Sequence, residues 1–213
     1  MIPLRCEHLT CSRADGTSSR ELTASFGPGS FWGFCGEDSE RILNVLGVIE
    51  RPDRGRLEVL GMNVLAMSEP SARAWRDRCF GFLFAHPHLL PSFTVAENVA
   101  MPFFRLCSRD PAVAKRRTLE ILDLMEISDL ESSAVGDLDE QDTWRVAMAR
   151  AIVHRPSILI AVSQPNPLLI PIARRLAAEA GTTILWNGER KNLSRQVDGI
   201  IDLEAGPVLA GVA

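Results

Sequence analysis

Short apolar runs bounded by turn residues recur along the chain and predict strands that are buried on both faces. Continuous runs of this kind, without polar alternation, are typical of the inner strands of a parallel sheet. They occupy Ser30–Cys35, Gly81–Phe84, Ser157–Val162, Thr182–Trp186 and Gly199–Leu203. Because stretches with helical periodicity separate the runs, the pattern predicts an α/β fold.

Three segments between these runs have the pattern of helices. Arg41–Ile49 is apolar nearly all round, which predicts a buried helix. Asp110 and Pro111 form a good N-cap and first-turn pair at the start of a second helix. In Asp142–His154, apolar residues fall on one stripe at helical spacing, and we interpret this stripe as core packing.

The middle of the chain, residues 85–155, has a mostly helical pattern. We therefore expect one domain over residues 1–213, with an α/β core formed by residues 1–84 and 156–213. Residues 85–155 would form a helical lobe inserted into that core. A chain of 213 residues is long enough to bury a sizeable core.

Composition and charge narrow the functional classes. The chain has 23 Lys and Arg residues against 27 Asp and Glu, so its net charge is -4. No basic excess exists to hold a nucleic-acid backbone, and we expect no nucleic-acid partner. The five cysteines include no CxxC pair, which favours reduced thiols in a cytosolic protein. The first ten residues lack the apolar core of a signal peptide, so we expect any membrane role to be peripheral.

Six segments, several of which overlap the runs above, follow one another in the same order as the corresponding segments of one protein family. They are Pro28–Gly36, Ile42–Gly47, Glu50–Gly55, Gly81–Pro102, Arg145–Ala151 and Pro156–Ala161. Together they resemble the ATP-binding subunit of ABC transporters, and most closely its lipoprotein-releasing, macrolide-exporter and cell-division subgroup. The resemblance covers nearly the whole chain. It implies a P-loop NTPase-like (RecA-like) core with a parallel sheet, an antiparallel β edge and an inserted helical lobe.

The loop that binds phosphate in this family is altered. The family's loop uses glycines to turn backbone N–H groups toward the phosphates, a Lys to neutralise them and a Ser or Thr to hold Mg²⁺. Here the loop is three residues shorter and lacks both the Lys and the second glycine. Glu37, Asp38 and Glu40 also add negative charge where a triphosphate would sit. The residues left at the nucleotide-binding position are Gly36, Ser39, Glu40 and Arg41.

Other positions that the resemblance assigns to chemistry have changed as well. Ala85 stands where the family has the Gln that contacts Mg²⁺ and the attacking water. Val162 and Ser163 replace the Mg²⁺-linked Asp and the general base, and Gly188 replaces the switch His. We therefore expect no ATP hydrolysis, no metal site and no cofactor. ATP and Mg²⁺ would be cofactors only if the chain were a working ATPase with unorthodox site residues.

The family's signature segment is also degenerate. Its positions are taken by Leu138, Asp139, Glu140, Gln141 and Asp142. In the family, small residues here let a helix N-terminus approach the γ-phosphate that the opposite subunit holds. The acids would instead repel that phosphate, and Asp139 is a candidate N-cap of its own helix.

The resemblance implies a docking surface, because the family's equivalent of Gly81–Pro102 faces the coupling helices of a membrane permease. The residues expected to form this surface are Phe84, His88, Leu89, Leu90, Phe93 and Val95. In sequence, exposed anchors look like core residues. The alternative that these side chains only pack the helical lobe therefore stays open.

These features lead to the hypothesis of a catalytically inactive ABC ATP-binding subunit. It would dock on a permease as a structural or regulatory subunit, at the cytoplasmic face of the inner membrane. It would form a homodimer, or a heterodimer with an intact ABC ATPase. Two alternatives remain: a functional ATPase that energises export, which nucleotide turnover would reveal, and a soluble regulatory module. The last predicts no permease partner and a polar face on Gly81–Pro102.

Overall fold

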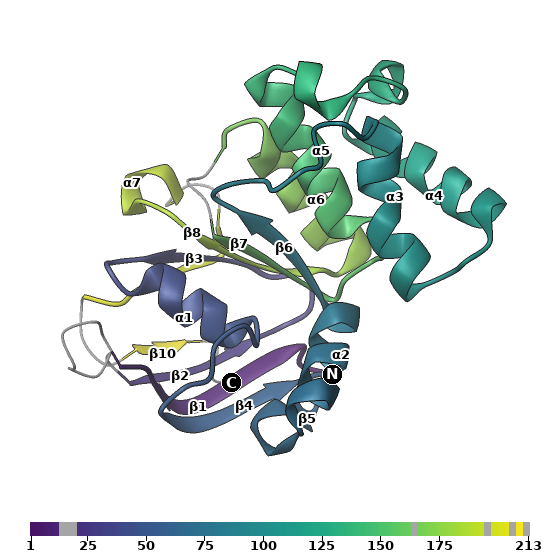
Figure 1. Cartoon of the computed structure of the whole chain (residues 1–213). Coiled ribbons are helices and arrows are strands. Elements are labelled where there is room, and N and C mark those ends of the chain that lie inside the picture. The colour runs from purple at the N-terminus through teal and green to yellow at the C-terminus, as the bar shows by residue number, and fades with distance from the viewer. Residues whose placement is uncertain (13–20, 163–165, 194–196, 205–207, 211–213) are drawn as a thin grey trace.

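The computed structural model of the chain describes residues 1–12, 21–162, 166–193, 197–204 and 208–210. Its strands form two five-stranded sheets, and helices pack between and beside them (Figure 1). One sheet is parallel, and the candidate nucleotide-binding residues follow the carboxyl end of its strand β3 (Phe31–Cys35). The other contains the first strand of the chain.

The parallel sheet contains all five strands that the apolar runs predict. Its strand order is β6-β7-β8-β3-β9, and every neighbouring pair is parallel. The strands are β3 (Phe31–Cys35), β6 (Phe80–Phe84), β7 (Ile158–Val162), β8 (Thr183–Asn187) and β9 (Gly199–Asp202). The fully buried β7 shows why the runs are continuous. Ile158 and Ile160 pack into one core cluster, while Leu159 and Ala161 pack into the other.

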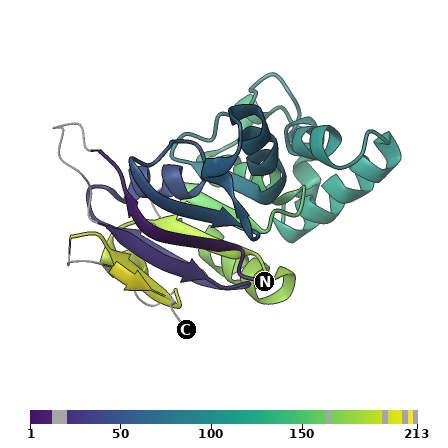
Figure 2. The same cartoon turned by 90° about the horizontal axis from the view of Figure 1, so that it is seen from below.

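The second sheet has the order β10-β2-β1-β4-β5, with β1 antiparallel to both β2 and β4. Its strands are β1 (Leu4–Thr10), β2 (Leu22–Phe26), β4 (Arg54–Val59), β5 (Met62–Asn63) and β10 (Val208–Ala210). The antiparallel strands expected at an edge therefore belong to a second sheet, in which β10 pairs with β2 in parallel. Figure 2 shows β1, β2 and β10 at the side of the molecule away from the teal helices. Burial alternates along β2, as in a strand with one face on the core.

Helix α1 (Ser39–Leu46) lies between the two sheets (Figure 1). Ile42, Leu43, Val45 and Leu46 are all 0% exposed, and they share one core cluster with residues of both sheets. The prediction of a buried helix is confirmed, but its expected end at Ile49 was wrong. The helix stops at Leu46, and the backbone has left the helical conformation by Val48, which has φ of 59°.

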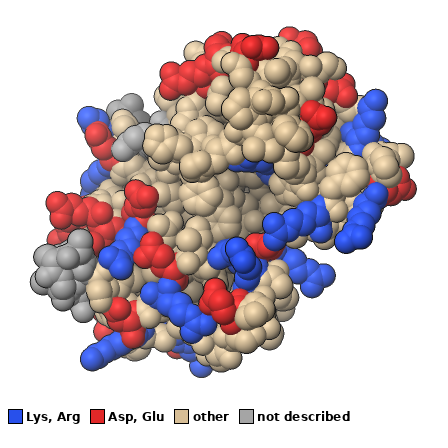
Figure 3. Space-filling model, in the orientation of Figure 1, with Lys and Arg blue, Asp and Glu red and all other residues tan. Residues whose placement is uncertain are grey.

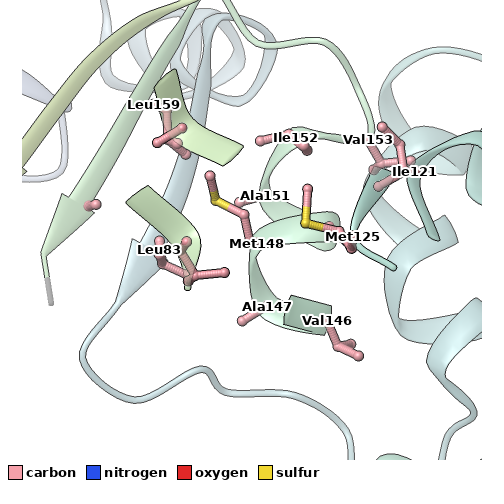
Figure 4. Packing of buried hydrophobic residues seen from close by; sticks show 14 of the residues in the cluster. Leu83, Ile121, Met125, Val146, Ala147, Met148, Ala151, Ile152, Val153 and Leu159 are labelled. Carbon is pink, nitrogen blue, oxygen red and sulfur yellow. The ribbon is translucent and has the colours of Figure 1, made fainter. Parts of the chain in front are cut away.

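The second core cluster joins the other face of the parallel sheet to the larger helices. Figure 4 shows Leu83 and Leu159 of the sheet facing Met148 and Ile152 of α5. The expected cap at Asp110 is present, since its side chain accepts a hydrogen bond from the Ala112 N–H at 2.9 Å. The helices are α2 (Glu69–Cys79), α3 (Val95–Leu106), α4 (Pro111–Leu124), α5 (Glu140–Ile152), α6 (Leu169–Ala180) and the short α7 (Arg190–Leu193).

Close packing between β6 and α5 generates a prediction about stability. A methyl group at Gly81 would lie 2.2 Å from the Ala151 carbonyl oxygen, so Gly81→Ala must push α5 away from the sheet. We expect this substitution to lower the free energy of unfolding by about 2 kcal/mol or more in a urea titration. Gly27→Ala is the matched control, because a methyl group there meets no atom within 4 Å. Equal stabilities of the two variants would contradict this packing.

Candidate functional site

The turn between β3 and α1 is short and internally bonded. Gly36, Glu37 and Asp38 alone connect the strand to the helix. Gly36 has φ of 103°, a conformation that glycine adopts without strain. The Ser39 N–H donates to the Gly36 carbonyl at 3.1 Å. This amide at the helix N-terminus is therefore committed to the turn and does not face a ligand.

An open pocket lies beside this turn and brings together segments from three strand ends. It contains three of the predicted site positions: Gly36, Ser39 and Gly188. The full lining is Cys35, Gly36, Ser39, Asn187, Gly188, Glu189, Arg190, Asp202 and Glu204. Carboxyl ends of parallel strands meet at one edge of a sheet, and this gathering follows from that topology.

The charge of the pocket is set by three carboxylates and one guanidinium. Arg190 is paired with Asp202, with Nη1 2.9 Å from Oδ2. The pKa of Asp202 lies below its usual range, first because the Glu204 N–H donates to it at 3.0 Å and also because of Arg190. Glu204 and Glu189 add two further carboxylates to the lining, and that of Glu189 is paired with Lys191 at 2.7 Å. The pocket is therefore a poor environment for a phosphate anion.

Two of the predicted nucleotide-binding residues lie elsewhere. Arg41 pairs with Glu50 at 3.5 Å and does not line the pocket. Glu40 is exposed and does not belong to the lining. Sequence reasoning missed Glu189, Asp202 and Glu204, although each lies at or just after the end of a predicted strand.

The remaining positions that were predicted to be degenerate lie at or after the ends of β6 and β7. Ala85 directly follows β6 and is exposed, with no polar side chain to offer a ligand. Val162 ends β7 and is 3% exposed, within the core cluster that contains α1. Ser163 lies outside the described residues. Of the described residues at these positions, none provides a carboxylate or an imidazole.

The residues predicted to form the signature segment lie at the start of α5. The Asp139 side chain accepts a hydrogen bond from the Asp142 N–H at 2.8 Å, which confirms the expected N-cap. Asp142 also pairs with Arg145 at 3.2 Å. Leu138 precedes the cap and packs partly against the core, while Glu140 and Gln141 are exposed. The acids stabilise their own helix N-terminus and reduce its attraction for an anion.

The six residues predicted to dock a permease have different exposures. His88, Leu90 and Phe93 are exposed, the last two by 41% and 44%. Phe84 and Leu89 are half-buried. The expectation that Val95 belongs to the surface was wrong. It is 0% exposed, because the first turn of α3 directs it into the core.

Helix α3 extends this surface with residues that the prediction omitted. Met101 and Phe104 are 37% and 38% exposed, and together with Phe93 they line an apolar groove. Glu97 and Arg105 also line it, with Ala100 between them. The signal was present in the sequence, because these positions recur at the spacing of one helix face.

The architecture is that of a nucleotide-binding cassette. Its parallel sheet leads through a glycine turn into a buried helix, and a second sheet and a helical lobe complete it. The family model described as ABC transporter matches residues 25–161. The chain belongs to the ABC transporter family, as an ATP-binding domain. No helix among the residues described is long and apolar enough to cross a bilayer.

Solved structures support the same architecture. The dimeric structure of MJ0796, a bacterial ABC transporter cassette, superposes with a TM-score of 0.81. It is 21% identical and the match covers 93% of each chain. The structure of the same cassette in a post-hydrolysis state, bound to ADP and Pi, also has a TM-score of 0.81. At this identity the likeness concerns the fold.

Curated relatives are lipoprotein-releasing system ATP-binding proteins LolD. The protein from Bordetella avium is 30% identical over 98% of this chain and 96% of its own length. The protein from Bordetella pertussis is 31% identical over 82% of this chain and 78% of its length. Relatives named for ATP binding, together with the cassette bound to ADP and Pi, contradict the expectation that no cofactor is involved.

The pocket carboxylates generate a prediction about nucleotide affinity. We expect a double variant, Glu189→Gln with Glu204→Gln, to bind a fluorescent ATP analogue about tenfold more tightly than the natural chain. The reason is that the two carboxylates together disfavour a nearby phosphate by about 1.4 kcal/mol, since Lys191 already offsets part of the charge of Glu189. Fluorescence titration with Mg²⁺ present measures this.

The matched control for this titration removes two exposed carboxylates from the helical lobe, by Glu126→Gln with Asp129→Asn. It should leave the affinity unchanged. If both double variants bind alike, the pocket charge does not set nucleotide affinity.

Proposed function

We propose that the chain is an ABC transporter ATP-binding subunit of the lipoprotein-releasing type that docks on a permease but does not hydrolyse nucleotide. The observation that carries the proposal is the short turn Gly36–Asp38, whose following amide bonds back to Gly36. A turn of this length cannot surround phosphates as the family's loop does. The buried helix and both sheets are nevertheless complete.

ATP with Mg²⁺ is the cofactor expected for a member of this family, since its relatives are named ATP-binding proteins. The residues of this pocket are not those by which the family holds the phosphates of ATP and Mg²⁺. The pocket offers Glu189, Asp202 and Glu204 to a polyphosphate, and its Arg190 is already paired. At the degenerate positions that are described, no side chain can activate water. Nucleotide binding, where it occurs, is therefore not followed by hydrolysis.

The subunit acts at the cytoplasmic face of the inner membrane, where it contacts an integral-membrane permease subunit. Residues 85–155 form the lobe that carries the docking surface, and residues 1–84 and 156–213 form the core. Exposed Leu90 and Phe93 favour docking over a soluble regulatory module, which would show a polar face here. A second cassette completes the assembly, either a copy of this chain or an intact ATPase.

The proposal predicts that the purified chain, alone or in complex with its membrane partner, turns over ATP no faster than the background rate. Phosphate release in the presence of Mg²⁺ measures this. Gly188→Asp, which adds a further carboxylate to the pocket, separates the chain's own activity from that of a contaminant. Turnover that copurifies with the chain and falls in this variant would overturn the proposal. Turnover that is equal in both preparations belongs to a contaminant and leaves the proposal standing.

A further inference from the structure

A larger cavity lies at the other end of the parallel sheet from the turn at Gly36. It opens beside Pro156 and Thr182, which precede β7 and β8, and we call it the basal pocket. Its walls come from the second halves of α4 and α6 and from the end of α5. Its volume is about 710 Å³, which is within the range of small-molecule sites.

The floor of the basal pocket is apolar. Ile121 of α4 and Ile152 of α5 are 2% and 3% exposed, and both belong to the core cluster that joins the sheet to the larger helices. Leu124 and Leu176 line the pocket as well and pack against the same cluster, but they are only half-buried. Covering their remaining apolar surface favours a ligand with an apolar body.

Two guanidinium groups form a basic edge of the pocket. Arg117 is held in place, because its Nε donates to the Val153 carbonyl at 2.9 Å and its Nη1 donates to Glu120 at 3.2 Å. Burial holds the pKa of the Arg117 guanidinium below its usual range, and the nearby charge of Arg155 lowers it further. The Arg155 side chain is exposed, and no carboxylate among the described residues pairs with it. This edge therefore has a guanidinium available for an anion.

Two carboxylates form a separate, acidic edge at the end of α4. Asp123 and Glu126 are exposed, and within the described parts of the chain no cation pairs with either of them. Helix α4 has no basic residue in its last turn, so the negative end of its dipole adds to the attraction for a cation. Arg117 and Asp123 lie six positions apart on this helix, which corresponds to about 9 Å along its axis.

The rim of the basal pocket combines charges of both signs. On the face drawn in Figure 3, by contrast, acidic side chains gather over the top of the lobe and basic ones gather along the α2 side. The third arginine of the rim, Arg175, is paired with Glu179 at 3.8 Å. The charges that remain unpaired are thus Arg155 at one edge and Asp123 with Glu126 at the other. A ligand that complements them carries one charge of each sign.

We propose that the basal pocket binds a short apolar peptide with free termini. The terminal ammonium group pairs with Asp123 and Glu126, and the terminal carboxylate pairs with Arg155. The apolar side chains of the peptide cover Leu124 and Leu176 on the floor. A fully extended tripeptide spans about 10 Å, which matches the separation of the two edges. The two charges of a zwitterionic lipid headgroup are adjacent instead, so such a headgroup does not reach both edges.

Peptide binding at this place is independent of the proposed function. The basal pocket lies at the amino ends of β7 and β8, whereas the pocket beside Gly36 lies at carboxyl ends of the strands. Neither nucleotide nor a permease is needed for the peptide to bind. Because α4 and α5 belong to the helical lobe and α6 does not, the bound peptide connects the lobe to the core.

The test is isothermal titration calorimetry of the purified full chain with the tripeptide Leu-Ala-Leu. We expect a dissociation constant below about 1 mM. The N-acetylated and the C-amidated forms of the same tripeptide should each bind about fivefold more weakly, because each lacks one terminal charge. Triglycine keeps both charges but lacks the apolar side chains, and it should bind about tenfold more weakly or worse.

Substitutions at the two edges assign each terminus of the peptide. Arg155→Gln should abolish the advantage of the free peptide over the amidated form and keep its advantage over the acetylated form. The double variant Asp123→Asn with Glu126→Gln should have the converse effect. These side chains are exposed, so we expect both variants to fold. Arg116→Gln is the matched control, because Arg116 is exposed on α4 but does not line the pocket, and it should bind as the natural chain does.

Three outcomes would overturn the proposal. The first is that Leu-Ala-Leu shows no saturable binding up to about 5 mM. The second is equal binding of the free, acetylated and amidated peptides, since the charged edges would then not recognise the termini. The third is unchanged binding in both edge variants, which would place the peptide elsewhere on the chain. None of these outcomes bears on ATP turnover, which tests the proposed function separately.

Discussion

The burial of α1 between two sheets is the constraint on which the rest of the structure depends. Ile42, Leu43, Val45 and Leu46 have no exposed surface, and each contributes about 1.5–3 kcal/mol when removed from water. Because they contact residues of both sheets, the helix fixes how the sheets sit relative to each other. It also fixes the end of the turn that begins at Gly36. The pocket therefore keeps its place in the fold even though its residues are unusual.

The sequence predicted the parallel sheet well because its strands are buried on both faces. Burial of this kind leaves an unbroken apolar run, as in Ile158–Val162, and such runs are easy to see. The antiparallel sheet was harder to predict, since Leu22–Phe26 alternates between buried and half-buried positions and leaves a weaker signal. The end of α1 was misjudged because apolar residues continue after Leu46, while the backbone there has already left the helix.

The candidate site was predictable where the family resemblance or a local pattern reached it. The short loop and Gly188 came from the resemblance, and the cap at Asp139 from neighbouring residues. Glu189 and Glu204 are far from Gly36 along the chain, and only the sheet topology brings them to one pocket. Hydrophobicity alone could not separate buried Val95 from exposed Phe93, because the direction of each side chain depends on where α3 begins.

The shortness of the turn between β3 and α1 bears on evolutionary reversibility. Both ends of the turn are anchored by burial, and only three residues connect them. Exchanging one side chain for another changes the charge of such a turn but cannot lengthen it. A return to a phosphate cradle would require an insertion as well as a new cation and new acids elsewhere. Under the proposed function, the lineage of this chain cannot regain hydrolysis by point substitution, whereas its docking surface can continue to adapt one residue at a time.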